Sequence, residues 1–166
     1  MAGPSNPETL RRMYDAFAGR DLDAFLEHCS PDVRIDSDIG SYPAGHDGIR
    51  DWWRDLTEAF AIGSPRVELM ADLGDVVLSF LTGLWRGHTS GVEFEAERIH
   101  LTRWRDGMAV WWGFYMSPEE AAAAAGLSED ESAGGTAPAA GSRRRLWPST
   151  PSTWRSARCA GPATAA

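Results

Sequence analysis

The stretch ERIHLTRWRDGMAVWWGFY, residues 97–115, predicts two antiparallel strands joined by a tight turn. Asp106-Gly107 is typical of such a turn, because Asp and Gly tolerate the positive φ angles that short hairpin loops require. Successive side chains of a strand point to opposite faces of the sheet. The first strand should therefore place four side chains on one face: Arg98, His100, Thr102 and Trp104.

The opposite face of that strand continues a row of glutamates, Glu93, Glu95 and Glu97. Acids in a row rarely share a buried face, so we expect their face to be wet and the His100 face to line an interior. Gly113 on the second strand would leave room there for a ligand. The same alternation predicts these interior residues on the second strand: Ala109, Trp111, Gly113 and Tyr115.

Helical spacing dominates the N-terminal third of the chain. Asn6-Pro7 predicts a helix start, with Asn as the cap and Pro at the first helical position. Asp21 predicts the start of a second helix, and apolar residues at helical spacing over 49–60 predict a third. Residues 33–36 alternate as in a short strand, and residues 37–48 are rich in Gly, Ser, Asp and Pro, which is typical of a loop.

Alternation with a period of two follows the helices. Residues 66–71 and 76–85 predict two strands ahead of the hairpin, and Ser117-Pro118-Glu119-Glu120 predicts a short closing helix. Helices followed by antiparallel strands indicate an α+β domain. Residues 128–166 show no periodicity and are dominated by small residues and Pro, so we predict that they are a disordered, low-complexity tail.

Composition excludes several classes of function. The net charge of −8 disfavours nucleic acid and anionic membranes as partners. The chain contains no lysine, which excludes Schiff-base chemistry and a P-loop. No apolar run approaches the roughly 20 residues that span a bilayer, and the N-terminus lacks signal-peptide features, so we expect a cytoplasmic protein. Cysteine and histidine show no metal-binding spacing, and we expect neither a metal nor an organic cofactor.

Five segments carry a resemblance to a known family: GRDLDAFLEHCSPDVRID, GHDGIRDWW, DLGDVV, RWRDG and EEAAAAAGL. Their order and spacing resemble the SnoaL-like polyketide cyclase group of the nuclear transport factor 2-like superfamily, over residues 6–127. The resemblance implies a curved antiparallel sheet packed on N-terminal helices, forming a cone with a central pocket for a small apolar ligand. It also implies a homodimer. The superfamily hosts unrelated chemistries, so function must be argued from the site.

The resemblance implies where a general base would lie. The base of ketosteroid isomerases falls on Ser37 of this chain, with Asp36 and Asp38 on either side. We expect Asp36 to be the base, since a desolvated carboxylate has a raised pKa. The alternative for Asp36 is a loop cap that binds backbone amides. Asp38 is expected to be a turn residue.

The resemblance also implies groups that stabilise an oxyanion. The isomerase tyrosine falls on Met13, beside Tyr14, and the second acidic residue falls on His100. An imidazole can donate a hydrogen bond to a developing oxyanion, so His100 could keep that role; a core or interface histidine is the alternative. The epoxide-hydrolase pattern is disfavoured, because it needs acids near Gly83 and Gly113.

Two functions stay open on this evidence. The first is a cofactor-independent enzyme of the isomerase or cyclase type, in which Asp36 removes a proton next to a carbonyl and His100 stabilises the enolate. The second is a non-catalytic ligand-binding or assembly module of the same fold. In either case the predicted ligand-binding residues are Tyr14, Arg98, Trp104, Trp111 and Tyr115. For Arg98 the alternative is an ion pair with a nearby acid, and for the aromatic residues it is packing.

Overall fold

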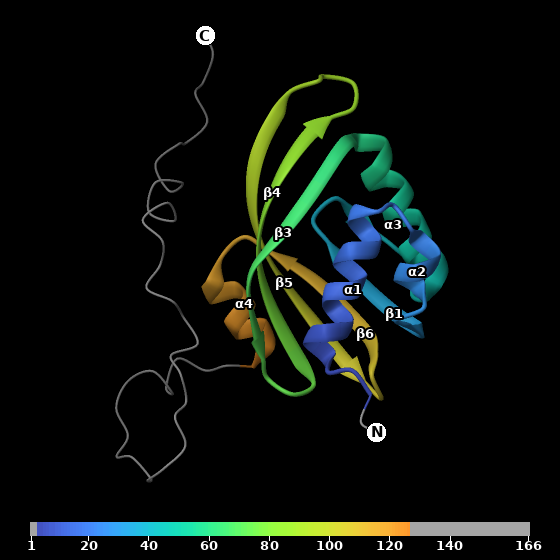
Figure 1. Ribbon diagram of the computed structural model, residues 1–166, viewed down its shortest axis with the longest axis vertical. Coiled ribbons are helices and arrows are strands. Elements are labelled where there is room, and N and C mark those ends of the chain that lie inside the picture. The colour runs from blue at the N-terminus through green and yellow to red at the C-terminus, as the bar shows by residue number, and fades with distance from the viewer. Residues whose placement is uncertain (1–2, 127–166) are drawn as a thin grey trace. The chain divides into compact units, whose positions relative to one another are not determined.

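A computed structural model describes residues 3–126 and shows four helices and six strands in that part of the chain (Figure 1). The helices are α1 (Asn6–Ala18), α2 (Leu22–Leu26), α3 (His46–Ala59) and α4 (Pro118–Ala125). The strands are β1 (Cys29–Ser37), β2 (Gly40–Ser41), β3 (Phe60–Asp72), β4 (Val76–Gly87), β5 (Glu93–Arg105) and β6 (Met108–Tyr115). The tail predicted for residues 128–166 lies outside the described residues.

The strands form one sheet in the order β2-β1-β6-β5-β4-β3. Strands β3 to β6 make the predicted antiparallel meander, and Asp106 and Gly107 turn the last hairpin with φ angles of 52° and 75°. Strand β1 pairs in parallel with β6, a long-range pairing that the sequence pattern did not predict. Strand β2 pairs with the end of β1, inside the segment that was predicted to be a loop.

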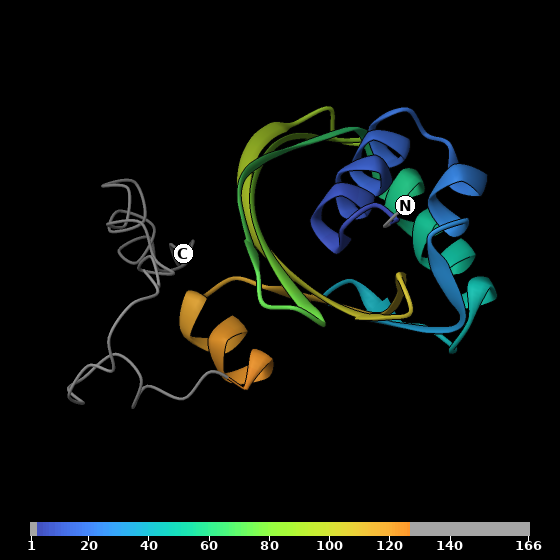
Figure 2. The same ribbon diagram turned by 60° about the horizontal axis from the view of Figure 1, so that its bottom comes forward.

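The sheet curves around the N-terminal helices. Helices α1, α2 and α3 lie on its concave side and α4 lies on its convex side (Figure 2). The main core fills the space between the concave face and these helices, where the Phe25 ring stacks on Trp112 with 5.2 Å between ring centroids. A smaller buried set, including Ile99, Leu101 and Ala121, lies apart from that core, where α4 meets the sheet. The predicted α+β architecture, with a curved sheet packed on N-terminal helices, is confirmed.

A β-bulge in β6 changes which of its residues face the helices. Trp104 pairs with Ala109 whereas Arg103 pairs with Trp111, so Val110 is an extra residue in β6. An extra residue reverses the alternation of faces beyond it. The prediction of an interior position is therefore correct for Ala109 and wrong for the residues after the bulge, which are Trp111, Gly113 and Tyr115.

Side-chain caps define where the helices begin. Ser5, rather than the predicted Asn6, caps α1, and it forms a reciprocal capping box with Glu8. Asp21 caps α2 as predicted, and Ser117 caps α4 by accepting a hydrogen bond from a backbone N–H in the first turn. The caps of α2 and α4 match their sequence signatures, and the cap of α1 lies one residue before the predicted one.

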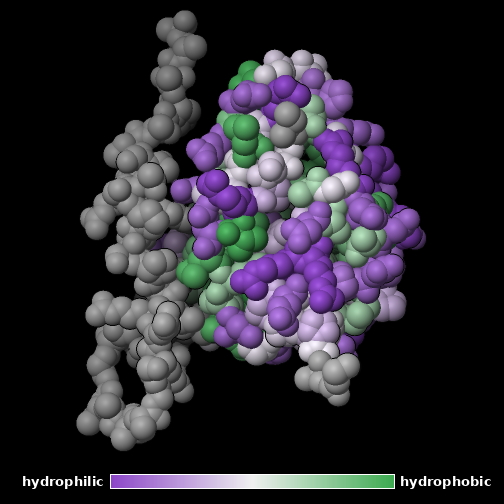
Figure 3. Space-filling view, viewed as in Figure 1, coloured by the Kyte–Doolittle hydropathy of each residue, from purple (hydrophilic) through white to green (hydrophobic). Residues whose placement is uncertain are grey.

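Few large hydrophobic side chains are exposed on the described domain. The face seen in Figure 3 is mostly hydrophilic, with hydrophobic residues gathered in small areas. The exposed large hydrophobic residues are Ile39, Leu69, Leu84, Val92, Phe94 and Met116. None of the helices within residues 3–126 is long and apolar enough to cross a membrane.

Gly48 offers a test of how α3 is docked. A Cβ atom at Gly48 would lie 1.8 Å from the carbonyl oxygen of Pro43, which is backbone and cannot rotate away. We predict that Gly48→Ala lowers the free energy of unfolding by about 1–3 kcal/mol through overpacking. The matched control is Asp47→Ala in the same helical turn, where the side chain is 91% exposed and the change should stay within about 0.5 kcal/mol. If Gly48→Ala and Asp47→Ala unfold at the same urea concentration, the close approach of Gly48 to the Pro43 carbonyl is contradicted.

Candidate functional site

A cavity opens between the concave face of the sheet and the helices. Its volume is about 840 Å³, counting the space at its mouth. Its wall is rich in aromatic side chains, which are Phe17, Phe25, Trp52, Phe60, Trp85, Phe94, Trp112 and Phe114. The polar side chains that reach it are Tyr14, Ser37, Asp38, Thr82, Arg98 and His100. An apolar wall with a few convergent polar groups is the usual composition of a small-molecule site.

Tyr14 and His100 form the central polar contact of the cavity. The phenol oxygen of Tyr14, on α1, lies 3.0 Å from Nδ1 of His100, on β5. Aromatic rings surround the pair: Trp112 lies edge-on to Tyr14 with centroids 5.8 Å apart, and Phe114 lies edge-on to His100 at 4.5 Å. Because β5 pairs with β4, Ser79 lies directly across from His100. The prediction that His100 lines an interior is confirmed.

Burial keeps both members of this pair uncharged. The pKa of His100 is lowered to about 3. Burial is the main cause of this shift, and the nearby positive charge of Arg98 is a smaller one. Burial also raises the pKa of the Tyr14 phenol well above its usual range. The Ser79 hydroxyl opposes that rise, although its oxygen meets no partner at full hydrogen-bond geometry. At neutral pH the site therefore holds a neutral imidazole and a neutral phenol.

The hydrogen bond assigns a tautomer to His100. A neutral imidazole has one nitrogen that donates and one that accepts. If Tyr14 donates its O–H to Nδ1, then Nε2 carries the ring proton. This assignment is made from the hydrogen-bond pattern. It leaves an N–H donor on the cavity-lining ring of His100.

A charged pair lies in the same cavity. Nη2 of Arg98 lies 3.7 Å from Oδ2 of Asp38, and the two side chains are 30% and 45% exposed. Arg98 comes from β5, two residues before His100. Asp38 follows the end of β1, in the turn that leads to β2. The cavity thus brings a cation, a carboxylate and a neutral hydrogen-bond donor into one apolar chamber.

The structure selects Asp38, rather than Asp36, as the carboxylate of the cavity. Val33, Ile35 and Ser37 alternate inward along β1, so Asp36 points to the other face and is exposed. Asp36 pairs across the sheet with Gly113 and contributes to the raised pKa of Tyr115, which also places it on the convex side. The expected cavity position of Asp36 is wrong because strict alternation excludes it, whereas the turn after Ser37 brings Asp38 back to the cavity.

The other predicted ligand-binding residues divide between the two faces. Tyr14 and Arg98 line the cavity as expected. Trp104 faces the same side but is buried in the core and does not line it. Trp111 lies beyond the bulge on the convex side, where the guanidinium of Arg103 sits 5.9 Å from its ring centroid. Tyr115 shares that face and does not line the cavity either.

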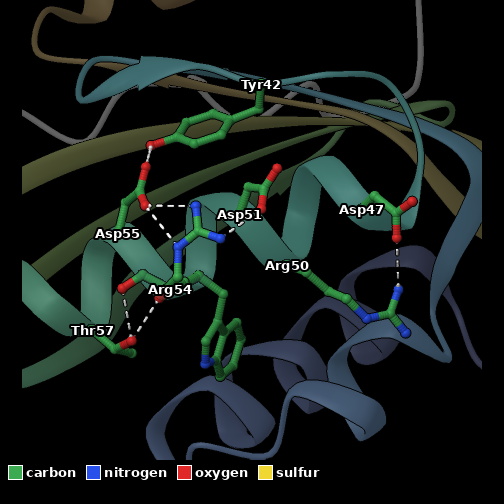
Figure 4. A network of polar contacts seen from close by, with 8 residues as sticks. Tyr42, Asp47, Arg50, Asp51, Arg54, Asp55 and Thr57 are labelled. Carbon is green, nitrogen blue, oxygen red and sulfur yellow. Dashed lines mark hydrogen bonds and ion pairs between the residues drawn. The ribbon is translucent and has the colours of Figure 1, made fainter.

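The segment between β2 and α3 is held by a polar network (Figure 4). The Tyr42 hydroxyl donates to Oδ2 of Asp55 over 3.1 Å, and Arg54 ion-pairs with both Asp55 and Asp51. Tyr42 also packs against the main core. This network ties the chain that follows Asp38 to α3, the helix that also contributes Trp52 and Leu56 to the cavity wall.

The described residues contain no group of three or more His, Cys, Asp or Glu side chains that could hold a metal ion. Cys29 is buried, and burial raises the pKa of its thiol to about 12. A thiol that stays protonated in this way is a small core residue rather than a nucleophile. The polar groups that the cavity offers a ligand include those of Asp38, Arg98, Tyr14 and His100.

Comparisons with known proteins agree with this architecture. The model of the SnoaL-like domain family matches residues 10–112. A nuclear transport factor 2-like protein of unknown function from Burkholderia pseudomallei superposes with a TM-score of 0.64 at 23% identity, covering 73% of this chain and 97% of its own. A protein from Catenulispora acidiphila with a ketosteroid isomerase-like fold, solved with trimethylamine, gives 0.61 at 20% identity and covers 76% and 98%.

A third neighbour is IdmH from Streptomyces antibioticus, which has been proposed to be a polyketide cyclase. It superposes with a TM-score of 0.59 at 22% identity, covering 74% of this chain and 99% of its own. A comparison with curated protein sequences gives no significant match. At these identities the structural likeness establishes the fold, and the chemistry rests on the cavity itself.

The low pKa of His100 predicts a specific loss of stability in acid. Unfolding returns this histidine to a pKa near 6.5, so between pH 6.5 and pH 3 the unfolded chain binds a proton that the native protein does not. The native state therefore loses about 2 kcal/mol from this group as the pH falls from 6.5 to 4.5. His100→Gln should remove that part of the acid sensitivity, measured by urea unfolding at both pH values.

The matched control is His88→Gln, at an exposed histidine of the β4–β5 turn. It should keep the pH dependence of the wild-type protein. If His100→Gln and wild type lose equal stability between these pH values, His100 is not held neutral by its burial.

Proposed function

Because this chain belongs to the SnoaL-like domain family, we propose that it is a cofactor-independent enzyme that transfers a proton next to a carbonyl group of a flat, apolar substrate. The observation that carries the proposal is the buried Tyr14–His100 hydrogen bond in an aromatic cavity that also contains the Asp38 carboxylate. A base and a neutral donor in one apolar chamber are the two groups that enolate formation requires.

The proposed step uses Asp38 as the base. The bond between the α-carbon and its hydrogen breaks, the proton goes to the carboxylate, and the electron pair forms the carbon–carbon double bond of an enolate. The developing oxygen charge accepts a hydrogen bond from the Nε2–H of His100. Return of the proton to another carbon of the conjugated system completes an isomerisation. In a cyclisation the enolate carbon attacks a second carbonyl carbon, the π electron pair of that carbonyl moves to its oxygen, and this oxygen takes the proton from Asp38.

Tyr14 acts as a positioning residue in this scheme. Its hydroxyl engages Nδ1 of His100 at 3.0 Å, which orients the ring and keeps the proton on Nε2. A neutral imidazole suits the role, because a cation would have to be desolvated in an aromatic chamber. The walls supplied by Trp112 and Phe114 keep water from the enolate oxygen and strengthen the hydrogen bond to it.

The second candidate is a non-catalytic ligand-binding module. The specific observation in its favour is the ion pair of Asp38 with Arg98, which engages the carboxylate. The aromatic wall would hold a flat ligand without any reaction. Binding without turnover is the result that separates the two candidates. Assembly of the protein as a homodimer in the cytoplasm stays a prediction.

Proton transfer can be tested with 2-tetralone, a flat bicyclic ketone, in deuterated buffer. We predict that the wild-type protein speeds exchange of the α-protons above the buffer rate, followed by proton NMR. Asp38→Asn should lower the protein-catalysed rate by about 10²–10⁴-fold, the usual contribution of a general base. His100→Phe should lower it by about 10²-fold, as loss of one oxyanion donor does.

Asp47→Asn, at an exposed acid of α3, is the control and should keep the wild-type rate. Binding of 2-tetralone is measured in parallel by quenching of tryptophan fluorescence. Binding with no exchange above buffer would refute proton transfer and favour the ligand-binding module. Loss of exchange in Asp36→Asn, with retention in Asp38→Asn, would reassign the base to Asp36.

A further inference from the structure

The guanidinium of Arg98 has hydrogen-bonding capacity that the protein leaves unused. A guanidinium carries five N–H donors. Within residues 3–126, one hydrogen bond engages them: Nη1 donates to the carbonyl oxygen of Glu97 over 3.0 Å. The contact of Nη2 with Asp38 is 3.7 Å long, which exceeds a hydrogen bond. Arg98 therefore keeps most of its donors free while it lines the cavity.

The surroundings of Arg98 favour an anionic partner from outside the protein. It is the one arginine among the cavity-lining residues of the described chain, and His100 is neutral there. Asp38 is the only carboxylate within 4.0 Å of the guanidinium in the same part of the molecule. Leu81, which pairs with Arg98 across the sheet, and Ala96 on the same face of β5 supply no acceptor side chain.

The pair with Asp38 can be exchanged at little cost. Both side chains are partly exposed, and ion pairs of this kind contribute little to stability. A ligand carboxylate can instead take two parallel N–H donors from the guanidinium, a geometry that is stronger and more directional. The aromatic residues of the same cavity, including Phe94 and Trp85, suit a flat ring attached to that carboxylate.

We propose that the cavity selects flat aromatic ligands that carry a carboxylate, and that Arg98 is the specificity-determining residue that binds this group in place of Asp38. The inference rests on the proposed function only in using the same cavity for a small molecule, and it requires no proton transfer. It changes the expected ligand from purely apolar to an aromatic anion.

The exchange of partners also links binding to the base. When a ligand carboxylate occupies Arg98, the Asp38 carboxylate loses its nearest positive charge and becomes free to accept a proton. Before that, Asp38 competes with the ligand for the guanidinium and repels its negative charge. Removing the charge of Asp38 should therefore strengthen the binding of an anion, although the same substitution removes the proposed base.

The test compares 2-naphthoate with 2-naphthamide, which have nearly the same shape and differ in charge at pH 7.5. Dissociation constants are measured by quenching of tryptophan fluorescence and checked by calorimetry. We predict that the wild-type protein binds 2-naphthoate at least about tenfold more tightly than 2-naphthamide, as expected for a charge-assisted pair. In Asp38→Asn the affinity for 2-naphthoate should rise by about three- to tenfold, with little change for 2-naphthamide.

Arg98→Met should reduce the preference for 2-naphthoate to about one, because Met keeps the packing of the stem and removes the charge. The matched control is Arg86→Met, at an arginine of β4 that does not line the cavity. Nη1 of Arg86 lies 3.8 Å from Oε1 of Glu93, so this arginine also has a carboxylate partner. It should keep the wild-type preference. Thermal unfolding is used to check that each variant is folded. If Arg98→Met does not fold, the predicted rise in the affinity of Asp38→Asn for 2-naphthoate is the test of the proposal.

Equal affinities of the wild-type protein for the two probes would overturn the proposal, and so would a preference that survives Arg98→Met. Failure of both probes to bind at about 1 mM would also overturn it, since this excludes a specific site for aromatic carboxylates. These outcomes are separate from the exchange experiment. A protein that prefers 2-naphthoate but does not exchange 2-tetralone protons has the anion subsite without the proposed catalysis. A protein that exchanges 2-tetralone protons but shows no preference for 2-naphthoate supports the proposed catalysis and refutes the anion subsite.

Discussion

The hydrogen bond between Tyr14 and His100 joins α1 to β5 across the concave side of the sheet, and the character of the cavity depends on it. An imidazole buried among Trp112 and Phe114 would be costly without a polar partner. The phenol supplies that partner without adding charge. Because the bond engages Nδ1, the remaining nitrogen of His100 is left for a ligand, so one contact both stabilises the packing of α1 on the sheet and prepares a donor.

Along β5, the side chains that face the helices become less polar as they become less exposed to water. Arg98 has a side chain that is 30% exposed, His100 is partly buried and neutral, and Thr102 is fully buried. A full charge is therefore placed only where solvent can still reach it, and neutral hydrogen-bonding groups occupy the deeper positions. Two of these side chains, Arg98 and His100, line the cavity, so it has a charged end and a neutral donor end.

The sequence predicts β5 correctly because the features that place its side chains lie within the hairpin itself. The Asp106-Gly107 turn fixes the hairpin, and alternation then places Arg98 and His100 on one face. The second strand fails for a physical reason: an extra residue at Val110 reverses every face beyond it, and nothing in the letters AVWWGFY marks that position. The parallel pairing of β1 with β6 is equally hidden, since it joins segments far apart in the chain.

Strand alternation also fails to predict that Asp38, and not Asp36, lines the cavity. Alternation along β1 correctly turns Ile35 inward and Asp36 outward, but the cavity carboxylate comes from the first residue after the strand. Its direction is set by the turn into β2 and by the Tyr42–Asp55 contact that anchors the following segment to α3. A residue placed by a turn is free of the strict two-residue period, and its carboxylate can approach both Arg98 and a ligand. The carboxylate of the cavity therefore lies where periodicity ends, while Arg98, His100 and Tyr14 lie on the regular strand and helix.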